Sequence, residues 1–281
     1  MKDHQNRFPV KAMANMLQVS ASGFYAWCTR PECDRSVRDR QLVAVVQAIH
    51  AEYDATCGSR RLGDELTAEG EPCGRHRARR LMGLAEVFVA TKKKFRVTTD
   101  SKHALPVAEN VLNRDFTATQ PNERWVADIT YLRTGEGWLY LAVVLDLYSR
   151  LIVGWSLKER LTRDLVDDAL TMALWRRKPK PGLLHHSDRG SQYCALDHQA
   201  LMARHGITVS MSRRGNCWDN ACVESFFGTL KRERVYRRRY ETRHQARLDV
   251  LDYLAFYNGR RRHSTLGNLC PIEFEAMRKS V

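Results

Sequence analysis

The stretch Trp125-Val126-Ala127-Asp128-Ile129-Thr130-Tyr131 decides the fold of this 281-residue chain, because it sets one acidic residue inside an extended apolar run. Strand-like runs cover 124–132, 138–147 and 151–157, and the turn Thr134-Gly135-Glu136-Gly137 separates the first two. A glycine-containing turn between two such runs predicts a β-hairpin. Most of the second run is apolar without alternation, which is typical of a strand buried on both faces.

Helical and strand-like patterns alternate after this hairpin. An amphipathic helix is expected at 163–177, a strand at 182–186, a helix at 195–205 that Gly206 ends, and a strand at 207–211. A last helix carries Glu224. The order β-β-β-α-β-α-β-α predicts an α/β layered domain with a mixed central sheet.

Three carboxylates stand in three different local settings. Asp128 lies within a strand, Asp188 follows a strand, and Glu224 lies on a helix, with residues 189–223 between the last two. Such placing predicts convergence on one site. Phosphodiester chemistry uses two divalent ions about 3.5–4 Å apart to activate the attacking oxygen and stabilise the leaving oxygen. An oxygen-only ligand set favours Mg²⁺ and admits Mn²⁺.

The charge of the chain indicates its partner. A formal net charge of +14 with 28% charged residues predicts a polyanion, and nucleic acid is favoured over membrane because no long apolar stretch or lipidation motif is present. The N-terminal residues have no secretory pattern, so a cytoplasmic protein is expected. The eight cysteines have irregular spacing without a C-x-x-C pair, which argues against a disulfide framework and a structural zinc site.

The N-terminal third is helical and basic. Residues 9–28 predict a helical hairpin capped at Ser20, either a helix-turn-helix or a hairpin that only packs on a neighbour. A second helical unit carries Arg60 and Arg61, which we expect to bind DNA phosphates. The expected organisation is a helix-turn-helix-like segment at 1–40, a DNA-binding-like domain at 41–84, a basic linker at 85–120, a catalytic core at 121–235 and a basic helical extension at 236–281.

Further residues near the acids are candidates for DNA contacts. Lys231 lies two helical turns after Glu224 on the same face, so it is expected to position DNA. We expect the same of Arg213 and Arg214, in a glycine-containing loop, and of Arg232, in the basic run 231–247.

Four other residues have simpler expected roles. Asp146 is expected to make a local turn or pair with Arg150, rather than act as a fourth ligand. Packing or hydrogen bonding is favoured over proton transfer for His185 and His186. Asp219 is expected to cap the helix that bears Glu224.

Longer strings make the signal specific. They are Trp125-x-x-Asp128-Ile129-Thr130-Tyr131, His186-Ser187-Asp188-Arg189-Gly190-Ser191-Gln192-Tyr193, Asp219-Asn220-Ala221-x-x-Glu224-Ser225-Phe226-Phe227, and the tail from Tyr257-Asn258 to Phe274. They resemble the DDE transposases of bacterial insertion sequences, in the retroviral-integrase-like group whose catalytic subunit is the second of two overlapping reading frames. The upstream Gly58-Ser59-Arg60-Arg61 segment also looks like that group.

The resemblance implies a ribonuclease-H-like integrase catalytic core, preceded by small helical domains, with Asp128, Asp188 and Glu224 as catalytic ligands of two Mg²⁺ ions. It implies cleavage at the 3′ end of the element, followed by attack of the freed hydroxyl on target DNA. It also implies a homo-oligomer on DNA at the nucleoid of a bacterial cytoplasm, and a partner or fusion from the upstream frame, since no heptad run of coiled-coil length is present. A DNA-binding regulatory or accessory subunit without independent catalysis remains the alternative, as does another nuclease on the same fold.

Overall fold

In the computed structural model, which describes residues 1–89, 107–213 and 217–279, the run around Asp128 forms the central strand of a five-stranded mixed sheet. The strands are β1 (Arg124–Thr134), β2 (Gly137–Asp146), β3 (Ile152–Lys158), β4 (Leu184–Ser187) and β5 (Thr208–Met211), in the order β3-β2-β1-β4-β5. β1 pairs antiparallel with β2 and parallel with β4. This order confirms the predicted hairpin and mixed sheet.

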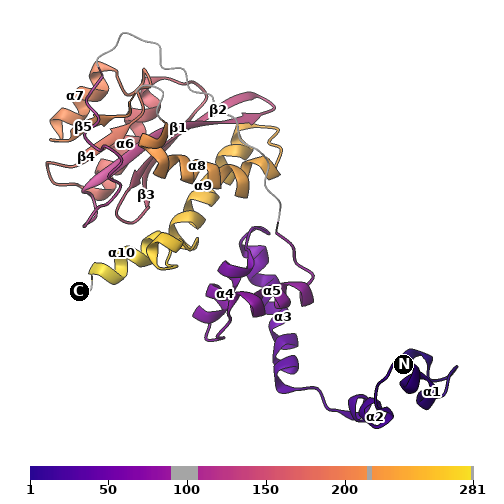
Figure 1. The fold of residues 1–281 in the computed structure, drawn as a ribbon. Coiled ribbons are helices and arrows are strands. Elements are labelled where there is room, and N and C mark those ends of the chain that lie inside the picture. Colours follow the sequence, from indigo (N-terminus) through magenta and orange to yellow (C-terminus); the bar gives the residue numbers. More distant parts are fainter. Residues whose placement is uncertain (90–106, 214–216, 280–281) are drawn as a thin grey trace. The chain divides into compact units, whose positions relative to one another are not determined.

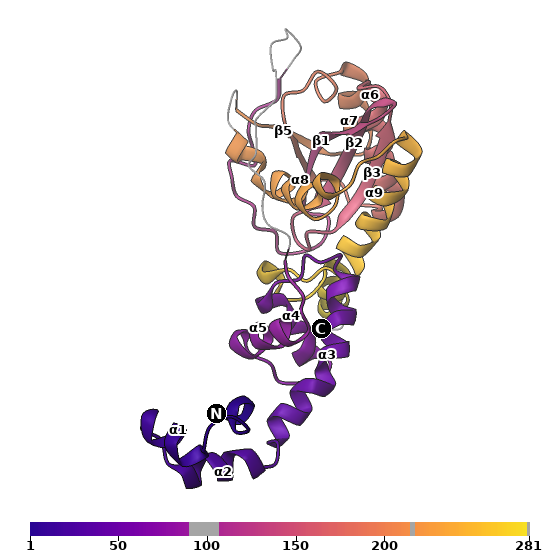
Figure 2. The same ribbon diagram turned by 90° about the vertical axis from the view of Figure 1, so that its right-hand side faces the viewer.

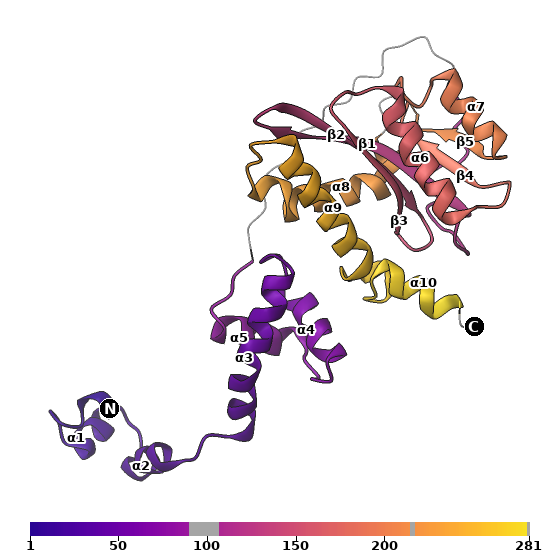
Figure 3. The same ribbon diagram turned by 180° about the vertical axis from the view of Figure 1, so that it is seen from behind.

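Helices cover both faces of the sheet (Figures 1 and 3). One face packs against α6 (Arg163–Arg177) and α7 (Leu196–Arg204), and the other packs against α8 (Ala221–Glu233) and α9 (Arg243–Gly259). The last helix after the sheet is α10 (Pro271–Lys279). All predicted strands and helices of the core are present, with ends displaced by at most two residues.

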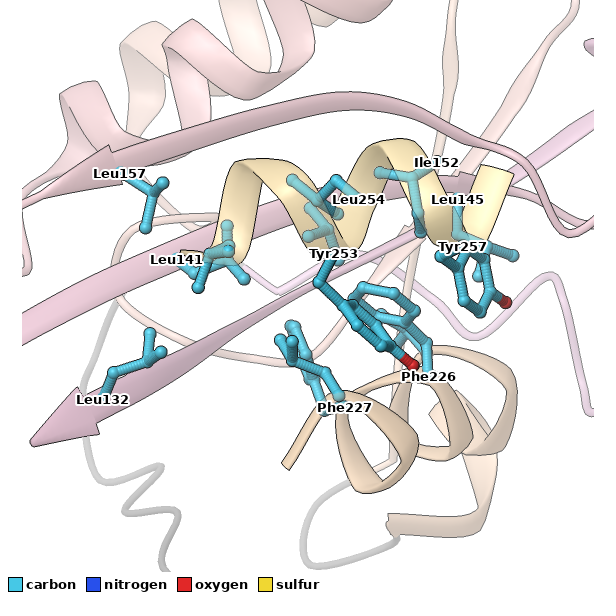
Figure 4. Packing of buried hydrophobic residues seen from close by; sticks show 14 of the residues in the cluster. Leu132, Leu141, Leu145, Ile152, Leu157, Phe226, Phe227, Tyr253, Leu254 and Tyr257 are labelled. Carbon is cyan, nitrogen blue, oxygen red and sulfur yellow. The ribbon is translucent and has the colours of Figure 1, made fainter. Parts of the chain in front are cut away.

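Side-chain alternation along β1 decides which way the catalytic candidate points. Val126 and Leu132 belong to the hydrophobic cluster on the α8 and α9 side, whereas Trp125 and Ala127 belong to the cluster on the α6 side. Figure 4 shows Leu132 in the first cluster with Phe226 of α8 and Tyr253 of α9. Because strand residues two apart share a face, Asp128 faces the α8 side.

Close contact between β3 and α6 holds the other face together. A Cβ atom added at Gly154 would lie 2.1 Å from the carbonyl oxygen of Ala169. Only glycine therefore allows the helix backbone to approach the strand this closely.

The N-terminal unit, Met1–Ala90, is separate from the unit Thr91–Val281 and wholly helical in its regular structure (Figure 2). It contains α1 (Val10–Met16), α2 (Ala21–Thr29), α3 (Asp34–Glu52), α4 (Ser59–Ala68) and α5 (Arg75–Leu84). The side chain of Ser20 accepts a hydrogen bond from the Gly23 N–H at 3.2 Å, which confirms the expected cap.

The structure bears on three of the expected segments. The segment boundary placed after residue 40 falls inside α3, because 34–52 is one uninterrupted helix. Part of the expected linker lies outside the described residues, but Leu112 at its end is buried in the core. α9, within the expected extension 236–281, supplies Val250, Tyr253 and Leu254 to that same core.

Two findings concern disulfide bonds and membrane-spanning helices. No disulfide joins the cysteines whose side chains the structure describes. Among the described residues, no helix has the length and apolar character needed to cross a membrane.

Candidate active site

Asp128 and Asp188 are brought together by the parallel pairing of β1 and β4. Val126 lies opposite His186, so Asp128 follows on one strand and Asp188 follows at the end of the other. An Asp128 carboxylate oxygen accepts the Ile129 N–H at 2.7 Å, and one of Asp188 accepts the Gly190 N–H at 2.9 Å. Each side chain is thus oriented by the backbone next to it.

Glu224 reaches this region from the first turn of α8, which packs on β1. The apolar residues Val223, Phe226, Phe227 and Leu230 of α8 are buried against the sheet, while Glu224 is exposed at the edge of that stripe. The helix is therefore fixed, and the glutamate side chain faces solvent.

The electrostatics of Asp128 connect the three acids. Burial raises the pKa of Asp128 well above its ordinary value, the charge of Asp188 raises it further, and the charge of Glu224 adds a smaller increase. Lys231 and the Ile129 N–H act in the opposite direction. Partial burial beside the apolar stripe of α8 also raises the pKa of Glu224, although the residue as a whole is exposed. The structure thus brings together carboxylates whose mutual repulsion Lys231 only partly offsets.

This donor set suits a hard divalent cation. The groups that face one another are carboxylate oxygens, and a bound cation would relieve the repulsion that raises the pKa of Asp128. Across the described ranges, no three acidic, histidine or cysteine side chains already surround one point closely enough to hold a metal ion. The two half-buried aspartates lie close to each other, and the exposed glutamate is the member whose side chain has room to move.

Lys231 lies at the border of this acidic group. Its ammonium group is 5.3 Å from the centre of the Tyr131 ring, and Asp128 raises the pKa of Lys231, although the larger effect of burial lowers it. A cation held beside the acids and partly removed from water can form a charge-assisted hydrogen bond with a phosphate.

Asn220 attaches the start of α8 to the strand that carries Asp128. Its side-chain amide donates to the carbonyl oxygen of Ala127 at 3.0 Å, and Asn220 is buried. Because Ala127 precedes Asp128 directly, this bond fixes the helix of Glu224 against the strand of Asp128. The sequence analysis did not single out Asn220, although it is part of the quoted string.

Asp219 has a different role from the expected one. The residue before α8 is Asn220, and the fully buried Asp219 accepts hydrogen bonds from Arg213, Arg114 and Asn110 at 2.7–2.9 Å. The bond to Arg213 and the neighbouring Arg114 hold the pKa of Asp219 well below its ordinary value. The prediction of a helix cap was wrong, because Asp219 lies within a short 3₁₀ turn, Cys217–Asn220, and Asn220 occupies the cap position.

The candidate DNA-binding residues occupy varied positions. Arg60 is exposed at the start of α4, and Arg61 lies half-buried with its guanidinium 5.4 Å from the centre of the Tyr53 ring. Arg213 is engaged by Asp219, and Arg232 is exposed at the end of α8. Arg214 lies outside the described residues.

His186 and Asp146 make local hydrogen bonds within the core unit. His186 is hydrogen-bonded to Ser210 at 2.8 Å and to Ser212 at 3.1 Å, and burial lowers its pKa to about 4. Asp146 accepts the Tyr148 N–H at 2.9 Å, which confirms the expected local turn. The expected pair with Arg150 was wrong: Arg177 is the basic neighbour, 3.5 Å away.

Three family profiles match most of the chain. Residues 118–217 match one profile described as an integrase core domain, residues 205–271 match a second profile of the same description, and residues 37–95 match an HTH-like domain. The last match covers α3, α4 and α5, and so lies on the second helical unit rather than on residues 9–28.

Curated relatives align almost end to end. The uncharacterized 31 kDa protein of insertion element IS600 from Shigella sonnei is 46% identical over 263 residues, 93% of this chain and 97% of the relative. Transposase InsF for insertion sequence IS3A from Escherichia coli (strain K12) is 44% identical over 278 residues, 98% of this chain and 96% of the relative.

Among solved structures, the HTLV-2 integrase catalytic core domain in complex with magnesium (trimeric form) aligns with 57% of this chain and 99% of that chain, at 17% identity and a TM-score of 0.45. The end-to-end relatives and the core-domain matches establish the family. This chain belongs to the insertion-sequence transposases with an integrase core domain, which are DNA transposases of the polynucleotidyl transferase type.

Proposed function

We propose that this transposase cuts the 3′ ends of its insertion sequence and joins them to target DNA, with Asp128, Asp188 and Glu224 as ligands of two Mg²⁺ ions. The observation that carries the proposal is the raised pKa of Asp128, caused after burial by the charges of Asp188 and Glu224. Divalent cations bound between these carboxylates would relieve the repulsion between their charges, on a chain that is otherwise strongly basic.

The bound ions would supply an activated attacking oxygen and charge stabilisation at the leaving oxygen. The residues of the chain supply position. Asp128 and Asp188 are fixed by backbone hydrogen bonds, and Asn220 holds α8 against β1. The exposed Glu224 completes the ligand set by a movement of its side chain.

The basic residues would divide into those that contact DNA and one that organises the site. Lys231 binds the phosphate next to the acids, and Arg232, Arg60 and Arg61 bind phosphates further along the DNA. Arg213 is bound to Asp219 through three hydrogen bonds. It therefore acts by joining the end of β5 to the 3₁₀ turn before α8. Arg214 lies between these two elements in the sequence and is proposed as a phosphate contact from that position alone.

The working complex would contain more than one copy of the chain, since both ends of an element have to be joined together. We also propose a partner or fusion supplied by an upstream reading frame, acting with this chain on the bacterial nucleoid in the cytoplasm. Comparing strand joining by this chain with joining by the fused protein tests the partner, and equal activity would contradict it.

The reaction is tested with labelled DNA that carries the terminal sequence of the element, incubated with the full chain in Mg²⁺ or in EDTA. The proposal expects a nicked product and a joined product in Mg²⁺, and neither in EDTA. Cleavage of DNA without element ends, and without any joined product, would indicate a general nuclease instead. Binding without cleavage in every condition would indicate an accessory subunit or a missing partner.

A further inference from the structure

Three aromatic side chains and one arginine share one face of the β1–β2 hairpin. Tyr131 pairs with Tyr140 and Arg133 pairs with Trp138 across the two strands, so the four side chains share a face. Trp138 is 46% exposed and Arg133 is exposed, while Tyr131 and Tyr140 are half-buried. We call these four residues the hairpin strip, and neither the proposed chemistry nor the core uses its exposed end.

We propose that the hairpin strip binds unpaired DNA bases next to the cleavage site, with Trp138 as the surface on which a base stacks. This inference rests on the proposed function, because it concerns the strand that the core would cut. Stacking on an aromatic ring accepts any base, since each base has a π-face, and nearby cations hold the phosphates.

The geometry leaves a ring available. The Trp138 and Tyr131 rings meet edge to face, with centroids 5.1 Å apart and planes at 84°. In an edge-to-face contact, the edge of one ring packs on one face of the other. Such a contact does not cover both faces of either ring. The remaining surface of Trp138 is open to a planar partner.

The hairpin is held rigidly. The Gly135 N–H donates to the Tyr240 carbonyl at 2.9 Å, and the Arg243 side chain donates to the Trp138 carbonyl at 3.2 Å. A Cβ atom at Gly135 would lie 2.5 Å from the Glu241 carbonyl oxygen, so the two segments are in tight contact. A platform that is already ordered loses little conformational entropy when a base binds.

The surrounding charges fit a nucleic-acid strand. The backbone N–H of Arg243 donates to Glu136 at 2.8 Å, and its guanidinium pairs with Glu159 at 3.1 Å. Glu241 pairs with Arg239. Arg133 has no acidic partner within the part of the chain that the structure describes. Its charge is therefore available to a phosphate beside a base stacked on Trp138.

The strip also lies at a useful distance from the acids. Asp128 is opposite Val143 and Arg133 is opposite Trp138, so five residues of strand separate the two pairs. At about 3.4 Å per residue this is roughly 17 Å along the strands, or about five stacked nucleotides. The strip lies on the α6 face of the sheet and Asp128 on the α8 face, so a DNA strand that contacts both would pass the edge of β1 beyond Val126, where the pairing with β4 ends. Lys231, beside Asp128, contacts the Tyr131 ring and links the strip to the acidic group.

The test compares two DNA probes in EDTA, so that no strand is cut. One probe is a fully paired duplex of the element end, and the other ends in a run of unpaired thymidines. Fluorescence anisotropy should give about tenfold tighter binding of the unpaired probe by the full wild-type chain. Trp138→Leu should lose this preference, and Trp175→Leu, which removes a 78% exposed tryptophan on α6, should keep it.

Crosslinking of the wild-type chain tests the contact without depending on the stability of a variant. Replacing the unpaired thymines by 5-iodouracil and irradiating should attach the DNA to Trp138 or Tyr131. Crosslinks found only elsewhere, or an unchanged preference in Trp138→Leu, would overturn the proposal. A chain that crosslinks here but never joins strands would contradict the proposed reaction and leave the stacking surface standing.

Discussion

At the scale of single residues, Asn220 should matter for rate more than for DNA affinity. Asn220→Ala removes the bond to the Ala127 carbonyl and frees α8, and with it Glu224, from the strand of Asp128. Misplacement by about 1 Å can cost about 100-fold in rate, so we expect that loss in strand joining at saturating DNA, with little change in binding.

Asn258→Ala is the matched control for Asn220. Asn258 also binds backbone, donating to and accepting from Ile152 at 3.0 Å each, but away from the acids. Its loss should lower thermal stability and leave the joining rate of the folded protein unchanged. Equal rate losses in the two variants would contradict a positioning role for Asn220.

Asp219 should stabilise the fold in a pH-dependent way. Its pKa lies well below the ordinary 3.8, so its stabilising effect is complete above that pH and is lost as the pH falls below it. Asp219→Asn breaks a buried ion pair and should cost about 3–5 kcal/mol in the free energy of unfolding at neutral pH.

Denaturant unfolding at several pH values measures this effect. The gap between wild type and Asp219→Asn should narrow as the pH falls, because the wild-type carboxylate then takes up a proton. Asp197→Asn, in an exposed pair with Arg163, should change stability by no more than about 1 kcal/mol. A gap that widens in acid would contradict this account.

Some residue roles could be predicted from local sequence and others could not. Ser20 was predictable, because a cap binds a backbone group three residues away. The partners of Asp219 include Arg114 and Asn110, about a hundred positions earlier, so only the fold brings them together. The ion pairs of the basic run 231–247 could not be predicted from the run alone either. Arg234 and Arg238 pair with Asp249, which lies beyond the run.

At the scale of elements, Gly154 should be irreplaceable. Gly154→Ala places a methyl group 2.1 Å from the Ala169 carbonyl oxygen, so β3 and α6 must separate. We expect a loss of about 3 kcal/mol in the free energy of unfolding. Gly228→Ala, on α8, meets only the end of the Arg232 side chain and should change stability by less than about 1 kcal/mol.

The core elements were predictable because their patterns are local. Apolar runs between glycine-containing turns became β1 and β2, and the stripe of 163–177 became α6 with the same bounds. The distance between Glu224 and the aspartates was not predictable, because it depends on how α8 packs and on the rotamer of an exposed side chain. The structure places these three acids in electrostatic contact, without a ligand cluster among the described residues.

At the scale of the whole molecule, the two units should share the binding of DNA phosphates. Each basic contact that is lost should reduce the slope of log affinity against log salt by about 1. Arg60→Gln should reduce the slope in this way without a loss of stability, because Arg60 is exposed. Arg77→Gln should instead destabilise the N-terminal unit, since Arg77 pairs with the buried Asp39 at 3.0 Å.

Anisotropy titrations of a DNA duplex over a range of KCl concentrations measure these slopes, and thermal unfolding measures stability. An unchanged slope for Arg60→Gln would remove Arg60 from the set of phosphate contacts. A reduced slope for Arg77→Gln in a fully folded protein would show that its pair with Asp39 opens on DNA.

The most direct test of the central claim is strand joining by Asp128→Asn, Asp188→Asn and Glu224→Gln on labelled element-end DNA in Mg²⁺, with Asp197→Asn as the surface control. Each of the three variants should lose the joined product and still bind the DNA, and the control should behave as wild type. Joining that persists in any of the three would contradict the assignment of that residue, and joining that persists in all would contradict the site.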